Sequence, residues 1–162
     1  MNKKLEEMPR VEQGRKGNLR IRRIVVATDL SEQSEKTTAY AVSLAQRFGA
    51  SVTIVHAFEP EEIALATPEV HELLDDARRE AELTLTGVVE GIRQSYPNCE
   101  MEFRVGEPAE QIALMAKTLN ADLVVTASHN PSLLARLFGM DQAPRIMRSI
   151  HCPVLVYREA NK

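Results

Sequence analysis

The chain has 162 residues, of which 44% are hydrophobic, and its formal net charge is −3. This length provides one full hydrophobic core but not two. No apolar run is long enough to span a bilayer, and the first residues lack the apolar segment of a secretory signal, so we expect a cytoplasmic protein without a membrane partner. A slightly acidic chain with no Trp and 4% aromatic residues is also poorly suited to binding nucleic acid.

Residues 1–20 form a locally basic segment with few apolar residues and no helical or strand periodicity. This composition predicts a flexible, solvated tail, and a basic arm that touches an anionic surface is the alternative. From Ile21 onward, periodic apolar segments are separated by turn and capping residues at regular intervals, so we predict a single folded domain over residues 21–159.

Five short apolar segments, several of them rich in β-branched residues, predict β-strands. The first, RRIVVAT (22–28), stops at Asp29, and the second is SVTIVHAF (51–58). The third, CEMEFRV (99–105), alternates apolar and polar residues, which is typical of an edge strand half open to water. The fourth, ADLVVTA (121–127), is apolar on both faces, and the fifth is CPVLVYR (152–158).

Segments with helical spacing alternate with these strands. In the first, Ser31 or Ser34 is placed to cap the helix and Gly49 to end it. The apolar face of this helix is predicted to comprise Ala41, Leu44, Ala45 and Phe48. In the second, Thr67 is the predicted cap and Pro68 the first helical residue. Its apolar stripe is predicted to comprise Val70, Leu73, Leu74, Ala77, Ala81, Leu85, Val88 and Ile92.

Two further helices complete the pattern. Gly106 and Pro108 turn the chain into a third helix, with an apolar side formed by Ile112, Met115, Ala116 and Leu119. Asp141 is placed to cap a fourth, short helix that contains Ile146, Met147 and Ile150.

Strands that alternate with helices predict an α/β fold, in which a five-stranded parallel sheet carries helices on both faces in a Rossmann-like arrangement. Ligands of such folds bind beyond the carboxyl ends of the strands, where successive crossovers go to opposite faces. In the strand order 3-2-1-4-5 this point lies between residues 28–31, after the first strand, and residues 127–132, after the fourth.

Several kinds of active site are excluded by their missing motifs. The turn TDLSEQS after the first strand contains no glycine, so a dinucleotide fingerprint is absent, and so is the Walker sequence. None of the four histidines stands at the spacing of a nucleophile or metal partner, and Cys99 and Cys152 form no CxxC pair. We therefore expect a protein that is not an enzyme and holds no metal. Asp29 and His129 remain as polar residues beside the predicted crevice. His129 is either a hydrogen-bond donor to an anion or an exposed loop residue.

Three blocks of the sequence together resemble the universal stress protein family. They are RRIVVATDLSEQSEKTTAYAVSLAQRFGASVTIVHAF, VGEPAEQIALMAKTLNADLVVTASHN and IMRSIHCPVLVYRE, in the right order and with the right separations over residues 22–159. The resemblance implies a parallel sheet in the order 3-2-1-4-5, the architecture of adenine nucleotide alpha hydrolase-like proteins. It also implies a homodimer formed through the last strand, residues 152–158.

In many members of this family a pattern after the fourth strand, G-x-x-G, nine residues and then G-[S/T], binds ATP. Its positions correspond here to Ala127, Asn130, Met140 and Asp141, and all four depart from the pattern. Met140 adds bulk where the backbone approaches phosphate, and Asp141 replaces a hydroxyl with an anion. Two unit charges about 4 Å apart repel by about 4 kcal/mol at an effective dielectric constant near 20. The chain thus resembles the branch of the family that does not bind ATP.

The sequence therefore predicts a non-enzymatic, homodimeric stress-response protein with a degraded nucleotide pocket and no bound cofactor. An ATP- or AMP-binding sensor is the first alternative. In that case the resemblance implies that Asp29 and the backbone around Ala27, Thr28 and Val55 hold the adenine. A hydrolase of a small phosphate ester is the second alternative, although no base and nucleophile are visible as a pair.

Overall fold

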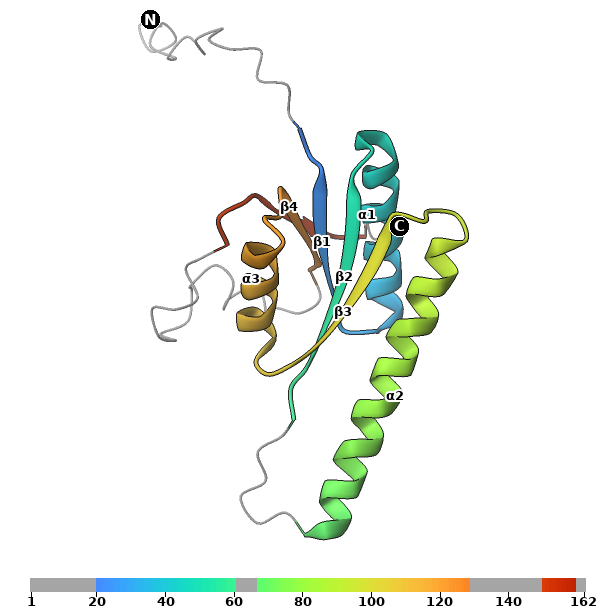
Figure 1. The fold of residues 1–162 in the computed structure, drawn as a ribbon, viewed down its shortest axis with the longest axis vertical. Coiled ribbons are helices and arrows are strands. Elements are labelled where there is room, and N and C mark those ends of the chain that lie inside the picture. Colours follow the sequence, from blue (N-terminus) through green and yellow to red (C-terminus); the bar gives the residue numbers. More distant parts are fainter. Residues whose placement is uncertain (1–19, 61–66, 129–149, 160–162) are drawn as a thin grey trace, which may run out of the picture.

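The computed structural model describes residues 20–60, 67–128 and 150–159. Five strands and three helices lie in these ranges (Figure 1). In chain order they are β1 (Arg23–Thr28), α1 (Glu32–Phe48), β2 (Ser51–Phe58), α2 (Pro68–Arg93), β3 (Cys99–Val105), α3 (Pro108–Thr118), β4 (Leu123–Ala127) and β5 (Val154–Tyr157). The five predicted strands and the first three predicted helices are confirmed.

The strands form one sheet in the order β3-β2-β1-β4-β5, and every neighbouring pair is parallel. This is the predicted strand order, and β3 lies at an edge as its alternating pattern indicated. β1 is the central strand, with β2 on one side and β4 on the other. The crossover from β1 to β2 runs through α1 on one face, and the crossover from β3 to β4 runs through α3 on the other, so the carboxyl end of β1 is the switch point of the sheet.

The sheet separates two hydrophobic clusters. On one face, α1 and α2 pack Ala41, Ala45, Leu85 and Val89 against alternate strand residues such as Ile24. On the other face, α3 packs against the intervening strand residues, among them Val25 and Ala27. Because the central strands are covered on both faces, nearly all of their side chains are buried, which explains the continuous apolar runs of β1 and β4.

The helix ends agree with the capping residues in the sequence. The Ser31 side chain caps α1 by accepting a hydrogen bond from the Ser34 N–H, and Gly49 ends the helix with a left-handed backbone (φ 65°). Thr67 and Pro68 begin α2, although the Thr67 side chain makes no capping hydrogen bond. The predicted cap of the fourth helix, Asp141, lies outside the described residues, and Ile150 lies in no helix and packs against the cluster under α3.

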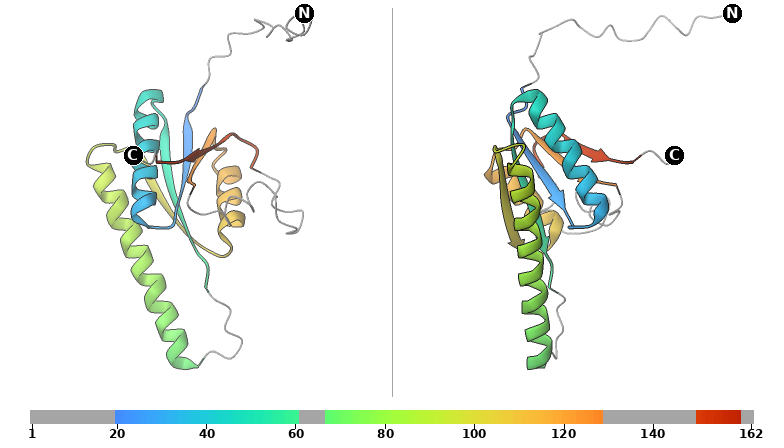
Figure 2. Two further views of the ribbon diagram at one scale, coloured as in Figure 1. Left: turned by 180° about the vertical axis from the view of Figure 1, so that it is seen from behind. Right: turned by 90° about the vertical axis from the view of Figure 1, so that its right-hand side faces the viewer.

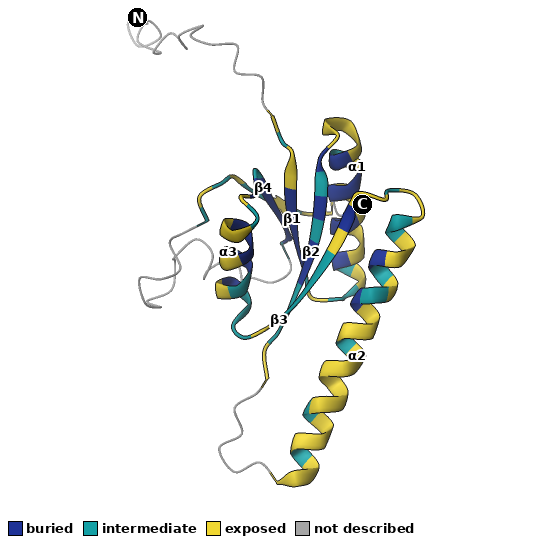
Figure 3. Ribbon diagram, in the orientation of Figure 1, coloured by how far each residue is buried: buried dark blue, intermediate teal, exposed yellow. Residues whose placement is uncertain are grey.

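The predicted apolar stripe of α2 is buried only over the second half of the helix. Leu85 is fully buried, whereas Leu73 is 68% exposed. Val89, which was not in the predicted stripe, is also fully buried, and the predicted Val88 is only partly buried. The first half of α2 extends past the sheet, and its surface is largely exposed (Figure 2, Figure 3). A stripe at helical spacing shows that a helix can bury one face, but the end of the sheet decides how much of that face is covered. The predicted apolar face of α1 is corrected in the same way, because Phe48, at the end of that helix, is 41% exposed.

Two further findings concern the described part of the chain. No helix in it has both the length and the apolar character needed to cross a membrane. Its two cysteines, Cys99 and Cys152, are free thiols. Burial raises the pKa of the Cys99 thiol to about 11, so this side chain packs in the core as a small apolar group.

Two leucines of α2, one buried and one exposed, provide a matched test of the core. Leu85→Ala should lower the free energy of unfolding by about 2–5 kcal/mol, because it leaves a cavity between α2 and the sheet. Leu83→Ala, on the same helix at a site that is 68% exposed, should change it by less than about 0.5 kcal/mol. Urea denaturation measures both variants, and equal losses would show that α2 packs differently.

Candidate functional site

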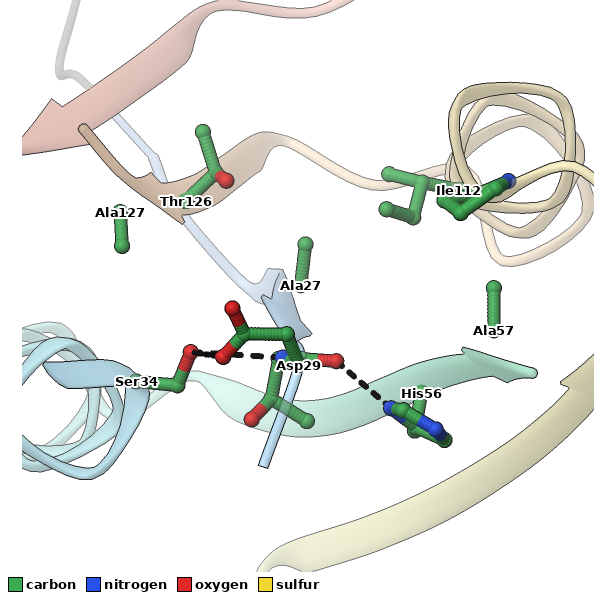
Figure 4. Close-up of a pocket in the computed structure, with 10 residues that line it drawn as sticks. Ala27, Asp29, Ser34, His56, Ala57, Ile112, Thr126 and Ala127 are labelled. Atoms are coloured by element: carbon green, nitrogen blue, oxygen red, sulfur yellow. Dashed lines mark hydrogen bonds between the residues drawn. The ribbon is translucent and has the colours of Figure 1, made fainter. Parts of the chain in front are cut away.

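A cavity of about 60 Å³ lies at the carboxyl ends of β1, β2 and β4, next to the first turn of α3 (Figure 4). This is the predicted switch point of the sheet. Its lining residues are Ala27, Thr28, Asp29, Ser34, His56, Ala57, Pro108, Ile112, Thr126 and Ala127. The walls are mostly small apolar side chains, and the polar groups come from the turn after β1 and from the ends of β2 and β4.

Asp29 and Ser34 fix the turn between β1 and α1. The Ser34 hydroxyl donates to Asp29 Oδ1 at 2.5 Å and accepts from the Asp29 N–H at 3.3 Å. Asp29 Oδ1 also accepts from the Ser31 N–H at 3.0 Å. Ser34 is 2% exposed, so its hydroxyl is enclosed while the Asp29 residue itself is exposed at the crevice. The carboxylate thus helps to begin α1 and also lines the cavity.

Leu30 has a left-handed backbone (φ 63°), which is unfavourable for a residue with a Cβ by about 1–2 kcal/mol. Its N–H donates to Thr28 Oγ1 at 3.0 Å, and its side chain packs against the core under α1. These contacts hold a strained residue in the turn, and the turn keeps Thr28 and Asp29 at the mouth of the crevice.

His56 connects the ends of β1 and β2. Its Nδ1 lies 2.9 Å from the Thr28 carbonyl oxygen. A carbonyl only accepts, so Nδ1 carries the proton in this contact. The ring centroid is 5.6 Å from that of Phe103 on β3, and these contacts hold the imidazole in place. His56 therefore has a structural partner on one ring nitrogen at the edge of the cavity.

Glu107 occupies the N-terminus of α3. Its carboxylate accepts from the N–H groups of Ala109 (3.1 Å) and Glu110 (2.7 Å). The next residue, Pro108, has no N–H to offer and lines the cavity. The backbone donors with which a helix start commonly binds an anion are therefore used by the chain's own carboxylate.

The structure brings together four of the residues predicted for the nucleotide pocket: Ala27, Thr28, Asp29 and Ala127. Val55 does not line the cavity; its side chain is fully buried under α3, and it pairs with Ala27 across the strands. The other predicted site residues, Asn130, Met140 and Asp141, and also His129, lie outside the described residues. Their contribution to the site stays a prediction.

Several lining residues were not predicted from the sequence. They are Ser34, His56, Ala57, Pro108, Ile112 and Thr126. The serine was identified only as a possible cap. Thr126 carried a signal that was missed, because a hydroxyl residue stands next to last in an otherwise apolar buried strand. Pro108 and Ile112 come from α3, which is separated from β1 in sequence and joins the site only through the fold.

The polar groups of the described cavity lining can form hydrogen bonds. No group of three or more His, Cys, Asp or Glu side chains in the described ranges could hold a metal ion. The Ser34 hydroxyl donates to the Asp29 carboxylate.

The Asp29–Ser34 contact gives a second prediction. Ser34→Ala should lower the free energy of unfolding by about 1–3 kcal/mol, because the partly buried Asp29 N–H loses an acceptor and the carboxylate loses a donor. Ser43→Ala is the matched control on the same helix, since Ser43 is exposed and its hydroxyl bonds only the Ala39 carbonyl. Chemical denaturation measures both, and a loss no larger than that of the control would contradict this role.

Comparison with known proteins agrees with the fold. The model of the universal stress protein family matches residues 20–158. The universal stress protein in the QAH/OAS sulfhydrylase 3′ region of Thermus aquaticus is 31% identical over 141 residues, which are 83% of this chain and 97% of that protein.

Two solved structures have the same fold. The universal stress protein UspA of Lactobacillus plantarum superposes with a TM-score of 0.67 at 25% identity, over 86% of this chain and 99% of that one. An Archaeoglobus fulgidus universal stress protein in complex with dAMP superposes with a TM-score of 0.54 at 23% identity, over 85% of this chain and 98% of that one. With the family model matched over nearly the whole folded region, the chain belongs to the universal stress protein family.

Proposed function

We propose that this protein is a non-enzymatic, homodimeric member of the universal stress protein family that acts in the stress response and binds ATP weakly. The observation that carries the proposal is the charge of the crevice. Among the described lining residues Asp29 supplies a carboxylate, and there is no Lys or Arg. A triphosphate is stabilised by cations and backbone N–H donors, and this part of the crevice provides neither for it.

The sequence after β4 supports the same conclusion. Met140 and Asp141 stand where ATP-binding relatives have a glycine and a hydroxyl residue. Both changes act against a phosphate, one by bulk and the other by like charge.

The absence of catalysis is supported by the partners of the polar groups in the cavity. Ser34 is hydrogen-bonded to Asp29, and His56 bonds a backbone carbonyl. Neither pair is the base and nucleophile of a hydrolase.

The dimer is supported by the free edge of β5. This strand pairs with β4 on one side and is the edge of the described sheet. Two residues at its end contact α1. Tyr157, the last residue of the strand, contacts Tyr40 (ring centroids 5.1 Å apart), and Glu159 forms an ion pair with Lys36 at 2.9 Å. An edge strand with no charge or bulge between Val154 and Tyr157 favours pairing with a second chain, and two copies about a two-fold axis satisfy both edges.

The alternative is an adenine-nucleotide sensor that uses the same crevice. One observation favours it: Ala27, Thr28 and Asp29, which the family resemblance assigns to the adenine, lie together in the cavity. The Archaeoglobus fulgidus relative was solved with dAMP, which carries a single phosphate. A monophosphate meets less repulsion than a triphosphate, so AMP-like ligands fit this alternative better than ATP.

The ATP prediction is quantitative. Calorimetry with Mg-ATP should give a dissociation constant no tighter than about 1 mM, or about −4 kcal/mol. The double variant Met140→Gly with Asp141→Ser should bind more tightly, because it removes both bulk and charge. Asp75→Ser, which removes an exposed carboxylate from α2, is the control and should change nothing. A micromolar constant for the unmodified protein would exclude the proposed weak binding and favour the sensor.

The dimer prediction uses the two sheet edges. Val156→Lys, at an exposed residue of β5, should shift the protein toward monomer by placing like charges near the two-fold axis. Val105→Lys makes the same change at an exposed residue of β3, on the opposite edge, and should leave the dimer intact. Sedimentation velocity at tens of micromolar (about 10–100 μM) distinguishes the two species. A monomeric parent protein would refute the dimer, and dissociation by Val105→Lys alone would assign it to the other edge.

A further inference from the structure

Residues 69–83 of α2 carry an acidic face with two exposed leucines. The members of this face follow one another at spacings of three and four residues, so they lie on one side of the helix, opposite the buried Leu85 and Val89. Leu73 and Leu83 are each 68% exposed. The acidic face comprises Glu69, Glu72, Leu73, Asp76, Glu80 and Leu83, and all six residues are exposed.

The charges on the acidic face are unfavourable for an isolated helix. Glu72, Asp76 and Glu80 stand at successive i, i+4 positions, where like charges destabilise a helix. Asp76 pairs with Arg79 at 3.1 Å, whereas Glu72 and Glu80 form no ion pair with other described residues. Most of this face lies where α2 projects past the sheet (Figure 2), so neither its carboxylates nor its leucines are covered by the described part of the chain.

The opposite end of the molecule carries a basic surface. It lies at the amino ends of the strands, where α1 and α3 also end (Figure 1). The Ser51 N–H donates to the Arg22 carbonyl, and the Asp122 N–H donates to the Arg23 carbonyl, so the start of β1 lies between the chain segments that follow these two helices. The cations of the basic surface are Arg20, Arg22, Arg23, Arg47 and Lys117, and all five are exposed.

The cations of the basic surface form no ion pair with described residues. Asp122 is engaged by the backbone instead, since its Oδ2 accepts from the N–H groups of Arg22 and Arg23 at 2.9 and 3.0 Å. Arg47 and Lys117 stand in the last turns of their helices, where a cation stabilises the helix dipole. That effect does not explain the arginines at the start of β1.

The two surfaces are complementary in charge and in apolar content. The acidic face has carboxylates around exposed leucines, and the basic surface has guanidinium groups beside Phe48, which is 41% exposed. Arginine binds carboxylates through paired, charge-assisted hydrogen bonds, and contact between leucine and phenylalanine removes apolar area from water. The surfaces lie at opposite ends of one molecule, so they do not meet within a chain (Figure 2).

We propose that the acidic face of α2 binds the basic surface of a second copy of this chain, head to tail. Such a contact is heterologous and leaves one acidic face and one basic surface free at the ends, so the assembly grows into a chain or closes into a ring. Neither surface contains β5 or lines the crevice. The inference therefore goes beyond the proposed function and does not depend on it.

Sedimentation velocity of the full chain at low and high salt tests the contact. At about 0.01 M salt, where the Debye length is about 30 Å, species larger than a dimer should form and increase with protein concentration. At about 1 M salt, where the Debye length is about 3 Å, they should disappear. Val156→Lys, which alters only β5, should retain this salt-dependent growth.

Charge exchange identifies the two surfaces. Arg22→Glu with Arg47→Glu reverses the basic surface, and Glu72→Lys with Glu80→Lys reverses the acidic face. Each double variant alone should associate at least about tenfold more weakly than the parent, because like charges then meet at the contact. An equimolar mixture of the two should recover the assembly, since each reversed surface meets the opposite charge on the other variant.

Matched variants control for net charge and for folding. Glu35→Lys with Glu110→Lys changes the net charge by the same amount as the α2 variant, at exposed residues of α1 and α3, and should leave the assembly intact. Leu73→Ala should weaken association without any change of charge. Arg22→Gln with Arg47→Gln introduces no carboxylate beside Asp122 and should also weaken it, which covers the case in which the reversed basic surface prevents folding.

Four results would overturn the inference. They are an absence of growth at low salt, equal loss of growth in the control pair and the α2 pair, a mixture of folded charge-reversed variants that does not assemble, and growth by the Arg22→Gln, Arg47→Gln variant equal to that of the parent. A parent protein that does not self-associate but binds a DNA duplex or anionic lipid vesicles would assign the basic surface to another partner, and the head-to-tail contact would then be wrong.

Discussion

The fold depends on the position of β1 between two parallel neighbours. Its pairing with β2 on one side and β4 on the other buries Ile24, Val25 and Val26 completely, and both helical layers pack on this strand. Parallel strands all point their carboxyl ends to one edge of the sheet, and the crossovers that end in β2 and β4, the two neighbours of β1, lie on opposite faces. A crevice at the end of β1 is a direct consequence, whatever the crevice holds.

The polar groups at this crevice are satisfied largely by the chain itself. The turn after β1 is held by Asp29, Ser34 and the strained Leu30, and the N-terminus of α3 is closed by Glu107. In a nucleotide site such turns and helix starts point their donors at phosphate. Here the donors serve the fold, and the Thr126 hydroxyl is left facing the cavity. This distribution of donors supports the proposed weak binding of ATP.

Much of the fold could be predicted from the sequence, because strand burial and helix ends leave local patterns. The apolar runs of β1 and β4, the edge position of β3 and the cap at Ser31 left such patterns, and the structure confirms them. The burial of α2 could not be predicted in the same way, since Leu73 and Leu85 have equivalent places in the stripe and only the extent of the sheet distinguishes them. The site was predicted in position through Asp29, but Ile112 and Thr126 join it by tertiary packing.

The central claim is that this universal stress protein retains the crevice of its family without retaining ATP. Native mass spectrometry of the full-length protein as purified, followed by denaturation and identification of any released small molecule, tests it most directly. The account predicts a species with the mass of two chains and no ATP in the released fraction. A complex that carries ATP in stoichiometric amount would contradict the account.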